Sequence, residues 1–264
     1  MSSRSQTSTT PPDAVRLAED AWAYTPLWPG QVREQRDEYV LWHGATPVQR
    51  GSVTRIRMRD VEQGREEVRA WFRERDRNDF EWFVADRSEP SDLREQLLAL
   101  GATLENDREA AMVATSPPPA VAGFDARPIA SYDEFVQQRE LLWEIFELRA
   151  ELREVGRDRH EEAWEEYTEM DGWVTFGAFA GDELVASGGV VFTPLGGFLM
   201  GGCTHPEWRG RGAYRAIVRA RWDEAARRGV PVLAVHARPT SGPILERLGF
   251  RTVSHVYVLL DHAN

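Results

Sequence analysis

The stretch RGRGAY, residues 209–214, lies where a predicted strand over 198–204 turns into a predicted helix over 212–228. Glycine adopts positive φ angles without a steric penalty and lets a ligand approach the backbone closely. The first N–H groups of a helix have no partner within the helix, and they form the positive end of its dipole. The stretch therefore predicts a phosphate-binding turn.

Two familiar phosphate-binding loops are absent from the sequence. There is no GxxxxGK[ST] motif, which argues against an ordinary nucleoside triphosphatase. There is also no GxGxxG motif with an acid about 20 residues later, which argues against a dinucleotide site. What remains is a backbone nest suited to pyrophosphate, with charge from Arg209, Arg211 and Arg215. A plain strand–helix turn with a solvated basic face is the alternative interpretation.

The composition limits the class of protein. The chain has 264 residues, of which 42% are hydrophobic, and a formal net charge of -11. Because so acidic a chain is a poor partner for nucleic acid or an anionic membrane, we expect neither. The single cysteine, Cys203, cannot form an internal disulfide, which suits a reducing compartment. No apolar run approaches the roughly 18 residues needed to span a membrane, so we expect a cytoplasmic protein.

Three consecutive prolines in ATSPPPAVAGFDARP, residues 114–128, predict a boundary between two halves, because proline cannot continue a helix. The expected organisation is a disordered tail over 1–12, a domain over 13–116, a linker over 117–128 and a domain over 129–264. In the last domain we expect strands at 173–180, 184–192, 198–204, 232–237 and 251–260, and helices at 135–148, 157–170, 212–228 and 243–248. In the first we expect strands at 53–58, 80–85 and 110–115, and helices at 61–75 and 92–100.

The order of these elements predicts an α/β fold with a mixed sheet. The strand–helix–strand unit over 198–237 predicts a parallel pair with a right-handed crossover, whereas the hairpin over 173–192 is antiparallel. Residues 81–102 also resemble residues 233–250, since each reads as a strand, a polar turn, a short helix and Leu-Gly. A weak two-copy repeat and chance similarity both remain open.

Two motifs resemble a known family. THPEWRGRGAYRAIV, residues 204–218, resembles the acetyl-CoA pyrophosphate loop of the GCN5-related N-acetyltransferases (GNAT), with the pattern Gln/Arg-x-x-Gly-x-Gly/Ala. SGPILERLGF, residues 241–250, resembles the last helix of that superfamily and the entry to its final strand. The resemblance implies a mixed, strongly curved sheet of the acyl-CoA N-acyltransferase type. It also implies a tandem member, with a smaller or degenerate α/β half at the N-terminus that lacks the loop.

The same resemblance implies a function and a site. The implied reaction is transfer of an acetyl group from acetyl-CoA, the co-substrate, to an amine by direct attack, with no metal. The backbone of Cys203 and Thr204 would pair with pantetheine like an added strand. The residues that would wrap the pyrophosphate are Arg209, Gly210, Arg211, Gly212, Ala213 and Tyr214.

Two positions depart from the family pattern. Tyr214 stands where Gly or Ala is usual. Leu245 stands where many members have a tyrosine that protonates the departing thiolate, and leucine cannot donate a proton. The proton donor must therefore be sought elsewhere.

Ser241 and His236 are the candidate catalytic residues. Ser241 could donate to the thiolate or cap the helix that it begins. His236 could act as a base, or it could be a core or surface histidine. The acceptor stays open among a small amine, an amino acid, an antibiotic, a peptide and a protein N-terminus, and the chain could be a monomer or a homodimer. A non-catalytic acyl-CoA-binding sensor or regulatory module is the alternative, and Leu245 favours it.

Overall fold

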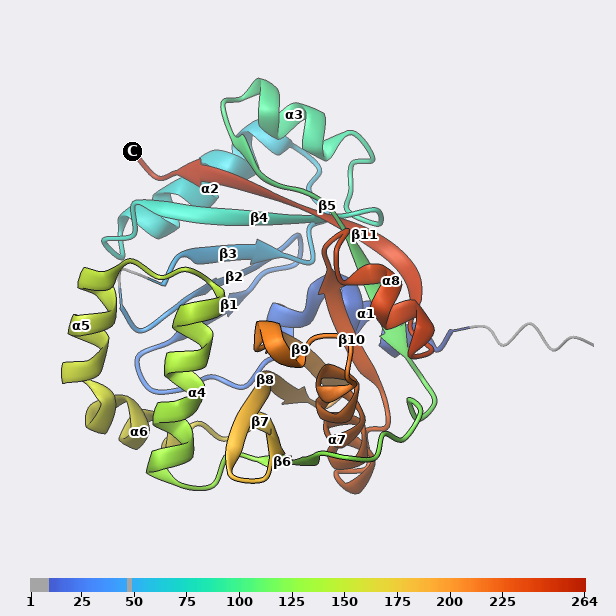
Figure 1. The fold of residues 1–264 in the computed structure, drawn as a ribbon. Coiled ribbons are helices and arrows are strands. Elements are labelled where there is room, and N and C mark those ends of the chain that lie inside the picture. The colour runs from blue at the N-terminus through green and yellow to red at the C-terminus, as the bar shows by residue number, and fades with distance from the viewer. Residues whose placement is uncertain (1–9, 47–48) are drawn as a thin grey trace, which may run out of the picture.

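One mixed sheet of 11 strands runs through the molecule (Figure 1). The computed structural model describes residues 10–46 and 49–264. The strand order is β1-β2-β3-β4-β11-β5-β10-β9-β8-β7-β6. The strands are β1 (Val32–Gln35), β2 (Val40–His43), β3 (Gly51–Thr54), β4 (Asp79–Ala85), β5 (Thr103–Ala114), β6 (Asp125–Pro128), β7 (Trp173–Ala180), β8 (Glu183–Thr193), β9 (Gly196–Thr204), β10 (Leu233–Ala237) and β11 (Arg251–His262).

Helices connect these strands and cover the sheet. They are α1 (Pro12–Asp20), α2 (Val61–Arg73), α3 (Leu93–Ala99), α4 (Tyr132–Ile145), α5 (Ala150–Asp158), α6 (His160–Glu169), α7 (Ala213–Arg227) and α8 (Gly242–Arg247), with short 3-10 turns η1 (Ala21–Ala23) and η2 (Pro206–Trp208). Within the described ranges, no helix is both long and apolar enough to cross a membrane. Residues 1–9 of the expected tail lie outside the described residues.

Strands β5 and β11 are exchanged between the two halves of the chain. The last strand, β11, pairs antiparallel with β4 and with β5, so it lies inside the N-terminal half of the sheet. Strand β5 pairs in turn with β10, so it lies inside the C-terminal half. Each half therefore supplies one long strand to the other, and β11 is drawn beside β4 in Figure 1.

The sheet is open, with β1 and β6 at its two edges. The expected strong curvature is wrong, because the sheet has no strong curl. The exchanged strands explain this difference. Since β5 and β11 hydrogen-bond to each other and to strands of both halves, the sheet continues from one half into the other instead of curling over a single core.

The same order of elements occurs twice. Strand β3 pairs parallel with β4, as β9 pairs parallel with β10. In each half a short helix and a long strand then follow, α3 with β5 and α8 with β11. The similarity of residues 81–102 to residues 233–250 thus corresponds to two structurally equivalent units.

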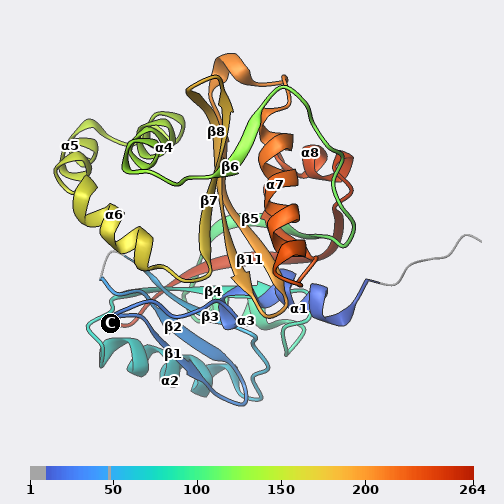
Figure 2. The same ribbon diagram turned by 90° about the horizontal axis from the view of Figure 1, so that it is seen from below.

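Helices α4 and α7 lie on opposite sides of β7 and β8 (Figure 2). Helix α7 buries Ile217, Val218 and Trp222 in a core with residues of β7, β8 and β9. On the other side, Phe135 and Leu141 of α4 pack in a separate cluster that includes Cys203. This arrangement fixes the start of α7 beside the end of β9.

Several expected elements differ in detail. The helix expected over 157–170 corresponds to α6, and it is preceded by a further helix, α5, that was not expected and that ends just before Arg159. Ser131 caps α4, because its hydroxyl accepts from the N–H of Glu134. In return, the Glu134 carboxylate accepts from the N–H of Ala130, the residue before the cap. The sequence interpretation missed α1, β1, β2 and β6, because these elements are short and their pairing partners are far away in the chain.

Candidate functional site

Strands β9 and β10 separate along their length. They pair only at Gly197 with Leu233 and at Phe198 with Ala234. Beyond this point β9 continues with β8 as far as Thr204, while β10 continues with β5. A cavity of about 720 Å³ lies by the far end of β9 and the starts of α7 and α8. Its lining includes Pro119, Ile145, Gly202, Cys203, Thr204, Trp208, Arg209, Gly210, Gly212, Ala213, Tyr214, Arg215, Thr240, Ser241, Ile244, Arg247 and Leu248.

The start of α7 opens into this cavity, which we call the cleft. Gly212 occupies the N-cap position with φ +107° and supplies no side-chain cap. Gly210 has φ +76°, and a Cβ atom there would meet nothing within 4 Å. The first N–H groups of α7 are therefore not occupied by a side-chain cap, which is the arrangement that binds anions at a helix N-terminus.

The equivalent helix start in the N-terminal half is closed. Helix α2 follows β3 as α7 follows β9, but the side chain of Asp60 accepts from the N–H of Gln63 at 3.0 Å. The preceding loop is also occupied, since the N–H of Met58 donates to the carbonyl oxygen of Glu89 at 2.9 Å. An aspartate cap repels an anion, so of these two equivalent helix starts that of α7 is open and that of α2 is closed.

The arginines near the loop do not form one cluster. Arg209 and Arg215 line the cleft, and the Nε of Arg209 donates to the carbonyl oxygen of Thr204 at 3.3 Å. Arg211 instead lies with its guanidinium 5.0 Å from the ring centre of Trp208. Arg247, which the sequence analysis did not select, lines the cleft from α8. No local sequence signal could place it there, because α8 reaches the cleft only through the fold.

Cys203 and Thr204, predicted to face pantetheine, lie at the end of β9 and line the cleft. Cys203 is 5% exposed, and burial raises the pKa of its thiol to about 11. A thiol with so high a pKa is uncharged at neutral pH and is a weak nucleophile. The geometry thus offers the backbone of this segment, rather than the sulfur, to a ligand.

The structure separates the two candidate catalytic residues. Ser241 lines the cleft and makes no cap, because its Oγ donates to the carbonyl oxygen of Arg238 at 3.2 Å. His236 does not line the cleft. Its Nε2 donates to the carbonyl oxygen of Ala18 at 2.7 Å, and desolvation lowers its pKa to about 4. Such a histidine is neutral at physiological pH and is held against α1.

Leu245 leaves the cleft without the usual tyrosine. Its side chain is fully buried in the core with Ile217, Val218 and Leu248. The position thus stabilises packing and faces no ligand. Any proton donor to a ligand in the cleft has to come from another residue.

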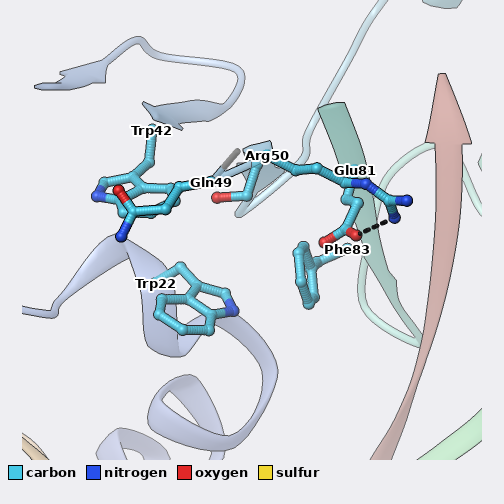
Figure 3. Close-up of a pocket in the computed structure, with 7 residues that line it drawn as sticks. Trp22, Trp42, Gln49, Arg50, Glu81 and Phe83 are labelled. Carbon is cyan, nitrogen blue, oxygen red and sulfur yellow. Dashed lines mark hydrogen bonds and ion pairs between the residues drawn. The ribbon is translucent and has the colours of Figure 1, made fainter. Parts of the chain in front are cut away.

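A second cavity, of about 390 Å³, lies in the N-terminal half (Figure 3). Trp22, Trp42 and Phe83 form its aromatic wall. Arg50 lies at its edge and is neutralised by Glu81 at 3.0 Å and by Glu105 at 2.7 Å. No motif of the sequence predicts this cavity. Because its arginine is already paired, it offers no free positive charge to a phosphate.

Among the described residues, no group of three His, Cys, Asp or Glu side chains is placed to hold a metal ion.

Comparison with known proteins agrees with the architecture. Residues 135–250 match the model of the acetyltransferase (GNAT) family. The sequence has no match among curated proteins. Solved structures share the fold at low sequence identity. A GCN5-related N-acetyltransferase from Kribbella flavida is 15% identical, with a TM-score of 0.65 over 94% of this chain and 95% of that one.

Two further structures extend this result. A tandem GNAT protein from the clavulanic acid biosynthesis pathway is 16% identical, with a TM-score of 0.59 over 96% of this chain and 94% of that one. A GCN5-related N-acetyltransferase from Sphaerobacter thermophilus is 17% identical, with a TM-score of 0.55 over 88% of this chain and 82% of that one. Solved structures thus share the fold of both halves of the chain, and one of them is a tandem GNAT protein. Residues 135–250, which contain the open helix start and most of the cleft, thus form a segment of the acetyltransferase (GNAT) family type.

Proposed function

We propose that the chain is a cytoplasmic N-acetyltransferase that moves an acetyl group from acetyl-CoA to an amine by direct attack. The GNAT family is generally acyl-CoA dependent. The observation that carries the proposal is the coincidence of two features at one cleft. The uncapped start of α7 lies beside the segment of β9 that has lost its β10 partner.

These features match the two parts of an acyl-CoA molecule. A pyrophosphate would lie on the N–H groups after Gly212, with Arg209, Arg215 and Arg247 supplying charge. Arg211 would contribute from the outer side of the turn. A pantetheine arm carries amide groups that can pair with a free strand edge, and Cys203 and Thr204 present such an edge.

The chemistry needs a neutral amine and help for a leaving thiolate. The amine nitrogen attacks the thioester carbonyl carbon, the C–N bond forms, and the C–S bond breaks with its electron pair on sulfur. Ser241 lines the cleft, and its hydroxyl is the candidate donor that the sequence analysis named for the thiolate. His236 has no role in the proposed reaction, because it is hydrogen-bonded to Ala18 outside the cleft.

A non-catalytic acyl-CoA-binding module is the second candidate. The buried, apolar Leu245 favours it, since the usual acid is absent. The two functions differ in turnover. Thiol release from acetyl-CoA in the presence of a panel of amines supports the enzyme, whereas saturable binding with no thiol release from any amine supports the module.

Acetyl-CoA binding is tested by chemical unfolding with and without the ligand. At about 100 times the dissociation constant, a ligand that binds only the folded chain stabilises it by about 2.7 kcal/mol. We expect this stabilisation in the wild type and its loss in the double variant Arg209→Ala/Arg215→Ala at the same concentration. Arg219→Ala is the matched control, because Arg219 pairs with Asp223 at 2.9 Å and does not line the cleft. No stabilisation of the wild type would contradict both candidate functions.

A further inference from the structure

A fully buried arginine lies behind the wall of the cleft. Arg221 on α7 is 1% exposed. Its Nε donates to the carbonyl oxygen of Ile217 at 3.1 Å, and its Nη1 donates to that of Gly189 at 3.0 Å. Among the residues that the structure describes, its Nη2 meets no partner with ordinary hydrogen-bond geometry. A buried cation normally has a carboxylate partner, because the desolvation cost is otherwise uncompensated.

The acidic groups that face Arg221 are a phenol and a thiol. Desolvation lowers the pKa of Arg221, whereas the neighbouring Tyr214 hydroxyl and Cys203 thiol act in the opposite direction. Both residues line the cleft. Arg221 therefore places a positive charge directly behind the part of the wall that Tyr214 and Cys203 form.

Helix geometry and two glycines hold this arrangement. Tyr214 and Arg221 are two helical turns apart and share one face of α7. A Cβ atom at Gly188 would lie 2.8 Å from the Nη1 of Arg221, and one at Gly202 would lie 2.7 Å from the Cε2 of Tyr214. The space under β8 and β9 is thus open only because these two strand positions are glycines.

We propose that Tyr214 protonates the departing CoA sulfur, with Arg221 as the positioning residue behind it. This inference rests on the proposed function. As the C–S bond breaks, the electron pair goes to sulfur and the Tyr214 hydroxyl supplies the proton. The tyrosinate then regains a proton from solvent, which has accepted the proton released by the amine nitrogen. A preorganised donor backed by a buried cation is effective where negative charge develops in a dry site.

The proposal explains two departures from the family pattern together. Leu245 removes a hydroxyl from the last helix, while Tyr214 adds one at a loop position where Gly or Ala is usual. The added ring fits because Gly202 has no side chain. The proton donor has thus moved from α8 to the start of α7.

The test reads the thiol of bound CoA and needs no acceptor amine. The apparent pKa of the CoA thiol is measured by the ultraviolet absorbance of its thiolate, with the complex of desulfo-CoA as the blank. All proteins include Cys203→Ala, which removes the only thiol of the chain. Other charged groups that face the cleft are Arg209, Arg215 and Arg247, and these are kept in every variant.

We expect the pKa of bound CoA to lie about one pH unit below that of free CoA, a tenfold change in the ratio of thiolate to thiol. Tyr214→Phe and Arg221→Met should abolish this shift in complexes formed at saturating CoA. Arg221→Lys should retain part of it, because it keeps the charge. Arg219→Met, a matched change on the outer side of α7, should retain all of it.

The outcomes separate the inference from the function on which it rests. A shift that persists in Tyr214→Phe, or equal pKa values for bound and free CoA, overturns the role of Tyr214 and leaves CoA binding intact. If Arg221→Met fails to fold, Tyr214→Phe and Arg221→Lys still decide the question. Absence of CoA binding by the Cys203→Ala protein and by the wild type overturns the proposed function itself.

Discussion

Arg65 on α2 donates two hydrogen bonds to the carboxylate of Asp261 on β11, one from Nε and one from Nη2, both of 2.8 Å. The two residues are 196 positions apart. Asp261 is 1% exposed, and its carboxylate also accepts from the indole N–H of Trp82 at 3.1 Å. The last strand of the chain is thus fastened into the N-terminal half by a buried ion pair, in addition to its pairing with β4 and β5.

Asp261→Ala should lower the free energy of unfolding by about 3 to 5 kcal/mol, because it leaves the Arg65 guanidinium without its buried partner. Urea unfolding measures the change. Asp13→Ala is the control, since the Asp13–Arg16 pair is exposed and should contribute at most about 1 kcal/mol. Equal effects of the two substitutions would contradict the structural role of the Arg65–Asp261 pair.

Gly188→Ala should destabilise the protein by about 1 to 3 kcal/mol, because the new methyl group overpacks the site of the Arg221 guanidinium. The matched control is Gly242→Ala, where a Cβ atom would meet nothing within 4 Å and φ is not positive. Chemical unfolding of the two variants provides the measurement. A neutral Gly188→Ala would show that Arg221 is not confined as described.

Stability should fall as the pH is lowered through the titration of His236. The folded-state pKa of about 4 lies below the ordinary value of 6.5, so the unfolded chain binds the proton more readily. The contribution is fully present above pH 6.5 and is lost as the pH falls toward 4, by up to about 3 kcal/mol. His236→Gln keeps a donor for the Ala18 carbonyl and should flatten this dependence.

The control for His236 is His262→Gln. His262 lies beside Asp79 with 56% of its side chain exposed, so its substitution should leave the dependence in place. Urea midpoints at about pH 7.5 and about pH 5 provide the comparison for all three proteins. A wild type whose stability does not fall between these values would argue against the buried, neutral state of His236.

Local signals in the sequence predicted the elements that build the site. Alternating and helical patterns placed β7, β8, β9 and α7 within a few residues of their bounds, because side-chain periodicity is fixed by backbone geometry. The two glycines of the loop predicted a backbone with positive φ at Gly210 and Gly212, which the structure shows. These features depend on neighbouring residues alone.

The five arginines between residues 209 and 221 show where such reasoning ends. Five arginines near the loop look equivalent in the sequence, yet Arg209 and Arg215 line the cleft, Arg211 stacks on Trp208, Arg219 pairs with Asp223, and Arg221 is buried. Whether an arginine of a helix faces the sheet depends on the hydrogen-bond acceptors and the free space that the sheet offers to its guanidinium. At Arg221 these are a carbonyl oxygen of β8 and the space left by Gly188.

The sequence by itself determined the glycine turn and the helix that follows it, and it left the two-copy repeat open. The tertiary structure decided that β5 and β11 change places, that α7 opens into a cleft while Asp60 closes the start of α2, and that Tyr214 lies in front of a buried Arg221. Steric limits and hydrogen bonding act between near neighbours and leave a trace in the local sequence. Strand partners and buried charges are selected by contacts between residues far apart in the chain, and only the folded molecule brings those residues together.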